Sequence, residues 1–267
     1  MNRRESLRLL AGTAVLAAGG ILRTPAFAQA QPPTKPETKP EPKPAATALP
    51  TVDQVLDKYV QAIGGKAALE KVNSRTSKGT FEIPAMGANG TFMSYEKAPN
   101  LTASTIDIPG FGTVQITFDG KNGWQKDPMQ GLREQTGAEL VMVKINSEFY
   151  GALKMKDLYK KVEVKGKDKV GSAEVYVIEA TPSEGSPVKL SFDATTGLLV
   201  RQETEQETPQ GKMPTEVLLE DYRVVDGIKL PFVVKTNTPA FGFVVKLEEI
   251  KHNVTIDDAK FSKPSAQ

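Results

Sequence analysis

Cysteine is absent from this 267-residue sequence, and histidine and tryptophan occur once each, as His252 and Trp124. Without cysteine the chain can form no disulfide framework, no thiol nucleophile and no cysteine-ligated zinc, haem or iron–sulfur site. A bacterial lipid anchor is excluded too, because it is attached to a cysteine at the cleavage point. A metal site based on one histidine would need carboxylates for all its other ligands. We therefore expect no metal and no cofactor.

Motifs of catalysis are also missing. The sequence contains no G-x-S-x-G nucleophile elbow, no phosphate-binding loop and no dinucleotide fingerprint. Its acidic residues show no spacing typical of a calcium loop or of a paired-acid site. His252 is expected to be a surface or capping residue. These observations predict a protein that is not an enzyme.

The part of the chain that is expected to fold has almost no net charge. Four arginines and one glutamate lie in residues 1–28, and three lysines and two glutamates lie in residues 29–50. Of the formal net charge of +2, about −2 therefore remains for residues 51–267. A nearly neutral domain lacks the basic surface that nucleic acid requires, so we expect no nucleic-acid partner.

The amino terminus has the layout of an export signal. Arg3 and Arg4 open a short basic region, an uncharged run follows from Leu9 to Leu22, and Ala26-Phe-Ala28 supplies small residues at a cleavage site. The paired arginines resemble the twin-arginine export motif. Residues 1–28 are thus predicted to be a cleaved signal, giving a soluble periplasmic protein with no membrane span in its mature part. An uncleaved amino-terminal anchor is the alternative.

Residues 29–50 alternate proline with lysine, glutamate and threonine. Such a segment cannot form a helix, a strand ladder or a core, so it is predicted to be an extended, disordered linker. Its Lys-Pro and Glu-Pro pairs resemble the periplasm-spanning spacer of TonB. A tether that positions the domain in the envelope is the alternative to a plain solvated linker.

The domain predicted for residues 51–267 opens with a helix. Thr51 and Gln54 form a capping-box pattern, apolar residues then repeat at helical spacing as far as Ile63, and Gly64-Gly65 ends the helix. A short helical turn over 67–72 is expected next. A second helical region is predicted from Leu132 to Leu158.

In the remainder of the domain, short segments in which apolar and polar residues partly alternate are separated by glycine, proline and asparagine. This pattern predicts an antiparallel sheet. About a dozen strands joined mainly by hairpins indicate a curved sheet or barrel in a mainly β, α+β fold. The expected strands are Thr76–Ile83, Gly90–Glu96, Leu101–Ile108, Gly112–Phe118, Gly123–Lys126, Val162–Val164, Ala173–Thr181, Val188–Asp193, Leu198–Glu205, Thr215–Val225, Ile228–Thr236 and Gly242–Ile250.

Trp124 and several methionines admit two interpretations. A lone tryptophan after a tight turn usually packs in the core, but it also suits the wall of an apolar cavity. Methionine fills irregular gaps and also suits surfaces that adapt to varied apolar ligands. The methionines concerned are Met86, Met93, Met129, Met142 and Met155.

Five segments, taken in their order along the chain, resemble the LolA-like superfamily, and within it periplasmic proteins of the outer-membrane lipoprotein-sorting type. The resemblance spans nearly all of residues 52–264. The segments that carry it are Val55–Gly65, Phe118–Trp124, Phe192–Leu199, Asp221–Phe232 and Asp257–Phe261.

The resemblance implies an incomplete antiparallel β-barrel, LolA/LolB-like, open along one side and covered by helices. It also implies an apolar hollow for lipid or lipoprotein acyl chains, with the helix around Leu140–Leu153 as a lid. We expect a binding or chaperone-like protein for lipidated or apolar ligands, with lipoprotein sorting as one such role. A tethered scaffold module that docks on an envelope protein is the alternative. The candidate ligand contacts are Met93, Phe118, Trp124, Val141, Met142, Ile145, Phe149 and Leu153.

Overall fold

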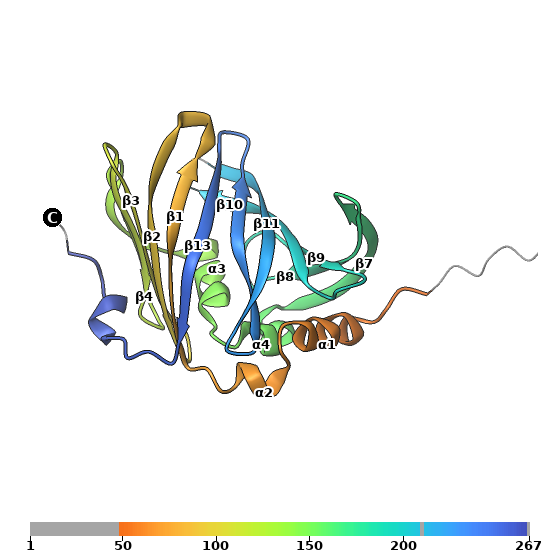
Figure 1. Ribbon diagram of the computed structural model, residues 1–267. Helices are drawn as coiled ribbons and strands as arrows, with labels where there is room; N and C mark the ends of the chain where they lie inside the picture. Colours follow the sequence, from red (N-terminus) through yellow and green to blue (C-terminus); the bar gives the residue numbers. More distant parts are fainter. Residues whose placement is uncertain (1–47, 209–210, 266–267) are drawn as a thin grey trace, which may run out of the picture. The chain divides into compact units, whose positions relative to one another are not determined.

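One curved antiparallel sheet makes up most of the structure (Figure 1). The computed structural model describes residues 48–208 and 211–265, so the predicted signal and almost all of the predicted linker lie outside the described residues. Thirteen strands of the described chain form the sheet. They are β1 (Ser74–Ile83), β2 (Ala88–Lys97), β3 (Leu101–Ile108), β4 (Gly112–Phe118), β5 (Gly123–Asp127), β6 (Gly131–Gln135), β7 (Lys161–Val170), β8 (Ala173–Thr181), β9 (Val188–Asp193), β10 (Leu199–Thr208), β11 (Gly211–Val225), β12 (Ile228–Asn237) and β13 (Gly242–His252).

The strand order shows how the barrel stays open. Two meanders, β1 to β6 and β7 to β13, meet where β1 pairs with β13. Strands β6 and β7 are the two edges of the sheet in the described residues. The chain between these edges forms helices α3 (Gly137–Ser147) and α4 (Gly151–Leu158), and α3 contacts β4 and β10 on opposite sides of the trough. The mainly β fold with an incomplete antiparallel barrel covered by helices is thus confirmed.

Helix α1 (Val52–Ala62) begins as its sequence predicts. The Thr51 hydroxyl accepts a hydrogen bond from the Gln54 amide at 3.2 Å, and the Gln54 side chain accepts one from the Thr51 amide at 2.9 Å. After the helix, Gly64 has φ +124° and lies so close to the β11–β12 turn that a Cβ would sit 2.3 Å from the Gly227 carbonyl oxygen. Only glycine fits there. A short helix, α2 (Lys66–Leu69), follows.

The cluster with the most buried apolar residues lies where α1 meets strands β8 to β10. Leu56 of α1 is buried with Ile178 and Phe192 of the sheet, and the Tyr59 ring packs edge-on against Phe192 with centroids 5.3 Å apart. The apolar stripe predicted for α1 is therefore the face that attaches this helix to the sheet.

The helical region predicted from Leu132 to Leu158 is wrong at its start, and the helical part is divided in two. Residues Gly131–Gln135 form the edge strand β6, which pairs with β5 after a tight turn. The helical part is also divided, because Glu148 adopts an extended conformation (φ −63°, ψ 111°) that ends α3 before α4 begins.

Most predicted strands match the observed ones within a few residues, and four have identical bounds. The main difference is β7, which continues well past Val164 to Val170 because it pairs along its length with β8. Two short 3-10 helices complete the fold, η1 (Pro84–Met86) and η2 (Asp258–Phe261). Within the described ranges, no helix is both long and apolar enough to span a membrane.

Candidate ligand-binding hollow

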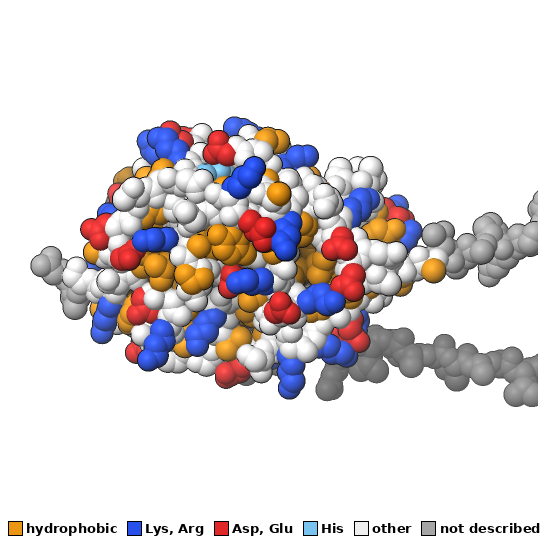
Figure 2. All heavy atoms as spheres, turned by 90° about the horizontal axis from the view of Figure 1, so that it is seen from below, with side chains coloured by type: hydrophobic (Ala, Val, Ile, Leu, Met, Phe, Trp, Pro, Cys, Tyr) orange, Lys and Arg blue, Asp and Glu red, His pale blue; other side chains and the backbone are white. Residues whose placement is uncertain are grey.

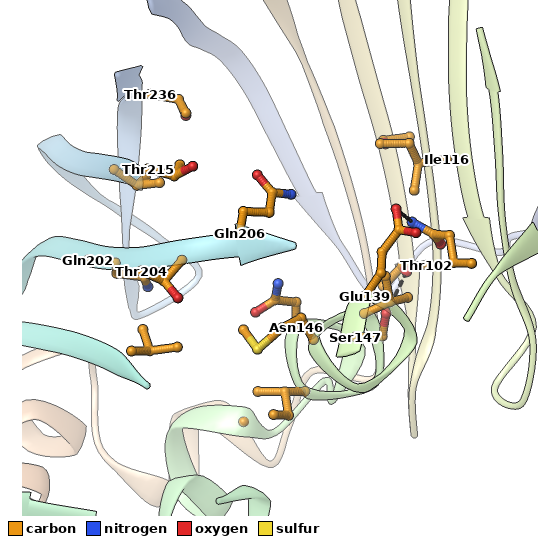
Figure 3. A pocket seen from close by; sticks show the side chains of 18 of the residues that line it. Thr102, Ile116, Glu139, Asn146, Ser147, Gln202, Thr204, Gln206, Thr215 and Thr236 are labelled. Carbon is orange, nitrogen blue, oxygen red and sulfur yellow. Dashed lines mark hydrogen bonds between the residues drawn. The ribbon is translucent and has the colours of Figure 1, made fainter. Parts of the chain in front are cut away.

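A hollow with a volume of about 780 Å³ lies inside the trough, between α3, α4 and the inner face of the sheet (Figure 3). Residues of β1 to β6 line it on one side, and residues of β9 to β13 line it on the other. Such a volume falls in the range of pockets that enclose a small molecule or part of a lipid. The hollow exists because the sheet curls without its two edges pairing.

The floor of the hollow is apolar. Met142 of α3 and Met155 and Leu158 of α4 line it, together with Val188 and Leu190 of β9. Met142 and Met155 also pack against the buried cluster beneath α1, so the floor continues the core of the domain. Two flexible thioether side chains at this surface suit apolar groups of varied shape.

One wall of the hollow is polar, and Glu205 is the charged residue of β10 that lines it. Gln202, Thr204 and Gln206 alternate along β10 with their side chains toward the hollow (Figure 3). The pairing of β10 with β11 sets Thr215 beside Thr204, and Thr236 of β12 extends the row. This wall presents hydroxyl and amide groups, each of which can donate and accept hydrogen bonds.

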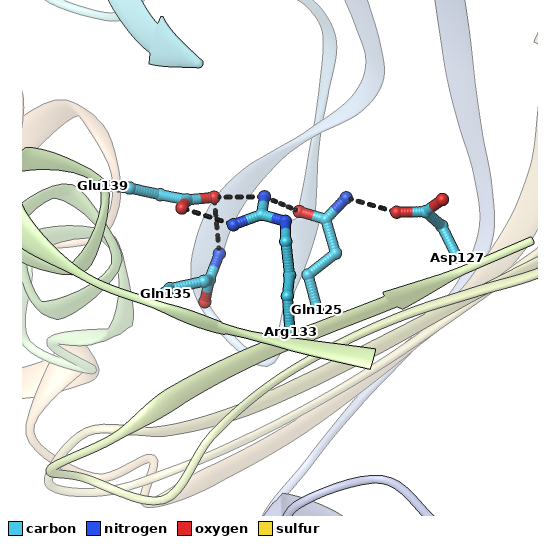
Figure 4. Close-up of polar contacts among 5 residues, drawn as sticks. All are labelled: Gln125, Asp127, Arg133, Gln135 and Glu139. Carbon is cyan, nitrogen blue, oxygen red and sulfur yellow. Dashed lines mark hydrogen bonds and ion pairs between the residues drawn. The ribbon is translucent and has the colours of Figure 1, made fainter. Parts of the chain in front are cut away.

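The opposite wall is tied to α3 by polar contacts. The hydroxyl groups of Thr102 and Ser147 are hydrogen-bonded at 2.8 Å, which joins β3 to the end of α3. Glu139, near the start of α3, accepts two hydrogen bonds from the Arg133 guanidinium, at 2.6 and 2.7 Å (Figure 4). Arg133 also donates to Gln125 at 2.8 Å. The hydrogen bond to Glu139 raises the pKa of Arg133, so the guanidinium stays charged.

Arg75 marks the lower end of the hollow. It forms an ion pair with Glu96 and lies 5.7 Å from the centre of the Phe149 ring, between α3 and α4. Burial opposes its charge, but the Glu96 carboxylate outweighs burial and holds the pKa of Arg75 above its ordinary value. A permanent cation thus holds the inter-helix segment against the sheet.

Beyond Arg75 lies a second cavity of about 260 Å³, which Tyr59, Tyr222 and His252 also line. Burial raises the pKa of Tyr59 to about 12. Burial also raises the pKa of Tyr222, whose hydroxyl donates to the Leu199 carbonyl oxygen at 2.5 Å. Both phenols are therefore neutral over the physiological pH range.

The position of His252 differs from the expected surface or capping role. Its side chain is only 2% exposed, and its Nδ1 atom lies 3.1 Å from an Asp226 carboxylate oxygen. Burial lowers the pKa of His252, and Asp226 opposes that effect. Its Nε2 atom has no hydrogen-bond partner within the described chain. No group of three or more His, Cys, Asp or Glu side chains that could hold a metal ion occurs among the described residues.

The structure separates the eight residues predicted to contact a ligand into three groups. Met142 and Ile145 line the hollow, and Ile145 also lines the smaller cavity with Phe149 and Leu153. Phe118 has no exposed surface. The remaining residues, which line neither cavity, are Met93, Trp124 and Val141.

Sequence reasoning missed the polar wall. Gln202, Thr204, Thr215 and Thr236 lie on strands whose polar positions would ordinarily face solvent. One signal was present: β10 has polar residues on both of its faces, with Arg201 and Glu203 alternating with Gln202 and Thr204. Such a strand fits a sheet whose inner surface encloses a polar cavity.

Comparison with known proteins identifies the fold. No protein-family model and no curated protein matches the chain. Among solved structures, a DUF1329 family protein from Desulfovibrio piger is 15% identical, with a TM-score of 0.55, over 81% of this chain and 99% of that one. A LolA superfamily protein from Nitrosomonas europaea is 14% identical, with a TM-score of 0.52, over 80% and 99% of the two chains.

A third solved structure, from Vibrio parahaemolyticus, is described as an outer membrane lipoprotein-sorting protein domain. It is 10% identical, with a TM-score of 0.51, over 79% of this chain and 97% of that one. At these identities the comparisons establish the architecture: the chain has the LolA-like fold that the order of its segments predicts.

Proposed function

We propose that this protein is a periplasmic, non-enzymatic binding protein that takes up the acyl part of a lipidated or otherwise amphiphilic molecule in the hollow. The observation that supports this most is the division of the hollow into an apolar floor of Met142, Met155 and Leu158 and a polar wall of hydroxyl and amide groups on β10 to β12. A ligand with an apolar tail and a neutral polar group matches both surfaces at once.

The apolar floor supplies the driving force. An acyl chain that lies on Met142, Met155 and Leu158 leaves water, and each buried methylene group contributes about 0.8 kcal/mol. Because methionine side chains repack easily, the same floor can accept chains of different length or branching. Binding of this kind is selective for apolar character and tolerant of detailed shape.

The polar wall sets the orientation. Gln202 offers an amide, and Thr204 and Thr215 offer hydroxyl groups, which donate to the Pro187 and Met213 carbonyl oxygens at 3.2 and 3.3 Å. The Gln202 amide, or a hydroxyl group that turns from its backbone acceptor, can donate to ester or amide carbonyl oxygens, such as those that join acyl chains to glycerol or to a protein. A carboxylate or phosphate placed there would lose its hydration close to the Glu205 carboxylate, which is costly. The wall therefore favours an esterified or amidated chain over a free acid.

The export signal and the fold support the location and the role. Residues 1–28 have the basic, apolar and small-residue regions of a secretory signal. The fold is shared with the domain from Vibrio parahaemolyticus that is described as lipoprotein-sorting. A lipoprotein carries acyl chains in ester and amide linkage, so lipoprotein acyl chains are one ligand that fits both surfaces of the hollow.

Filling the hollow tests the proposal. Met142→Trp places a larger side chain on the floor, whereas Val141→Trp introduces the same side chain at the neighbouring position of α3, which does not line the hollow. Titration of a fluorescent fatty acid methyl ester, read on the probe's own emission, should show affinity at least about tenfold weaker for Met142→Trp. Val141→Trp should bind like the unmodified protein. Equal binding by both variants, or no binding by the unmodified protein, would contradict the proposal.

A second pair of variants separates the wall from the floor. Thr204→Val and Thr215→Val together remove two hydroxyl groups with little change in shape. Affinity for an acyl ester should fall about five- to tenfold, because a hydrogen bond contributes about 1 kcal/mol. Affinity for a plain alkyl probe should stay the same or rise. If both probes respond alike, the wall does not recognise the polar group.

A further inference from the structure

The exposed large apolar side chains of the domain gather at one end of the sheet. Four of the six that the described residues expose lie at the tips of strand-connecting loops: Met86 (70% exposed), Phe111 (45%), Met129 (81%) and Phe241 (44%). These four loops join β1 to β2, β3 to β4, β5 to β6 and β12 to β13. Because neighbouring strands are antiparallel and β1 pairs with β13, all four loops lie at the same end, the top in Figure 1.

The four loop tips share a sequence pattern. Each begins with proline, carries a methionine or phenylalanine one or two positions later, and ends with glycine. None contains a charged residue. The tips, which we call the apolar rim, are Pro84-Ala-Met-Gly87, Pro109-Gly-Phe-Gly112, Pro128-Met-Gln-Gly131 and Pro239-Ala-Phe-Gly242.

The shape of each tip is set by its backbone. Gly87, Gly112 and Gly131 have φ values of +62°, +115° and +71°, which favour glycine, and proline fixes φ at the start of each turn. The apolar side chains are thus held outward on short turns. Presenting them to a partner costs little conformational entropy.

The charged side chains next to the rim are engaged in contacts of their own. Glu82 accepts two hydrogen bonds from Lys246 at 2.8 Å. Asp107 accepts one from Thr113 at 2.9 Å. The Asp127 carboxylate accepts hydrogen bonds from backbone amides of its own turn, including one from the Met129 amide at 2.9 Å. Polar groups therefore lie below the tips, while the tips themselves offer only apolar or neutral surface.

The spacing of the tips favours a fluid partner over a rigid one. The four loops are consecutive along the strand order, and each lies two strands from the next. At about 4.8 Å per strand, the tips are about 10 Å apart and span on the order of 30 Å. A protein partner would need four separate pockets at matching positions. A lipid surface accepts isolated methionine and aromatic side chains wherever they fall.

From this arrangement we propose that the apolar rim is a membrane-docking edge, which inserts the tip side chains of Met86, Phe111, Met129 and Phe241 into the interface of a neutral lipid bilayer. Insertion is driven by burial of apolar surface, since the tips carry no charge to attract anionic lipids. Binding should therefore be insensitive to salt.

This inference goes beyond the proposed ligand and does not depend on it. The two would nevertheless fit together, because Gln206, Thr236 and Phe243, which line the hollow, lie within two residues of the rim ends of β10, β12 and β13. Docking through the rim would bring this end of the hollow to the lipid surface.

Co-sedimentation of the full chain with phosphatidylcholine vesicles tests the inference. The variant that combines Met86→Ser, Phe111→Ser, Met129→Ser and Phe241→Ser should bind at least about tenfold more weakly. The matched control is Val224→Ser, since Val224 is 64% exposed but lies at the opposite end of β11, and it should bind normally. High salt should not weaken binding. Circular dichroism confirms that each variant is folded.

A reporter that leaves the rim apolar gives an independent result. Phe111→Trp, made with Trp124→Phe, should shift its emission to shorter wavelength when vesicles are added. Val224→Trp in the same background should not. The inference is overturned if the unmodified protein does not bind the vesicles, if the fourfold variant binds equally well, or if the Phe111→Trp emission does not move. In each case the binding of an acyl ester in the hollow can be measured without vesicles, so failure here leaves the proposed function standing.

Discussion

The two ends of the curved sheet are built differently. At the helical end, seen in Figure 2, lysine, arginine, aspartate and glutamate side chains spread around a band of apolar surface. Several are paired there, for example Lys156 with Asp53 at 2.7 Å. At the other end, the four tips of the apolar rim have no charge. At the helical end, contacts within the domain stabilise the fold. At the rim end, exposed apolar side chains are available for contact with a partner.

This difference indicates that the residues that stabilise the fold lie mainly at the helical end, whereas the residues exposed for interaction lie at the rim end. Helices α1 and α4 contact each other across the helical end, and α1 covers the buried cluster around Phe192. At the rim end a second buried cluster, with Phe81 and Val245, lies below the tips, so the tips themselves add little to the core. We expect substitutions at the two ends to have opposite consequences.

The largest expected effect comes from exchanging one phenylalanine for alanine at each end. Phe192→Ala removes a ring that is 1% exposed and should lower the free energy of unfolding by about 3–5 kcal/mol. Phe111→Ala at the rim should change it by less than about 0.5 kcal/mol. Urea unfolding measures both. Similar decreases in the free energy of unfolding for the two variants would contradict this difference between the two ends.

An intermediate effect is expected where the edge strand β6 joins the helical floor. Glu139→Gln replaces the carboxylate that accepts both hydrogen bonds from Arg133. The free energy of unfolding should fall by about 1–3 kcal/mol, because a partly buried guanidinium loses its counter-charge. Glu134→Gln, on the exposed side of the same strand, is the control. Hydrogen exchange should show faster opening of α3 only in the first variant.

The smallest expected effect is a pH dependence confined to the helical end. Burial holds the pKa of His252 below its ordinary value of 6.5. As pH falls through about 6.5, the unfolded chain takes up a proton more readily than the folded one, so stability should decline. His252→Gln should make the stability curve flatter in that range, as followed by urea unfolding at several pH values. Vesicle binding should not change there, since the rim has no titratable group. A steeper curve for His252→Gln would show that the sign is wrong.

The sequence predicted the architecture well because the physical signals for it are local. Alternation and turn residues gave strands such as Leu101–Ile108 and Ala173–Thr181 with their observed bounds. The capping residues Thr51 and Gln54 placed the start of α1. The order of these segments then pointed to a LolA-like fold before any three-dimensional comparison.

The errors arose where long-range pairing decides the outcome. Leu132, Arg133, Glu134 and Gln135 are individually good helix formers, but they form β6 because the turn after Asp127 brings them against β5. No local pattern reports that pairing. Propensity was therefore overruled by tertiary structure.

The candidate site was harder to predict than the fold. Met93 and Trp124 were chosen for their apolar character, yet it is their neighbours Phe92 and Gln125 that line the hollow. Alternation separates the two faces of a strand but does not say which face is enclosed. In a hollow with a polar wall, hydrophobicity cannot supply that answer, so residues such as Thr204 become visible only once the sheet is curled.

The central claim, that the hollow carries a molecule with an acyl chain, is tested most directly by native mass spectrometry of the full chain purified from the cells that produce it. The account predicts a bound species with the mass of a lipid or acylated molecule. That species should be retained by Val141→Trp and absent from Met142→Trp. Unmodified protein without any bound species, or Met142→Trp protein that retains it, would contradict the account.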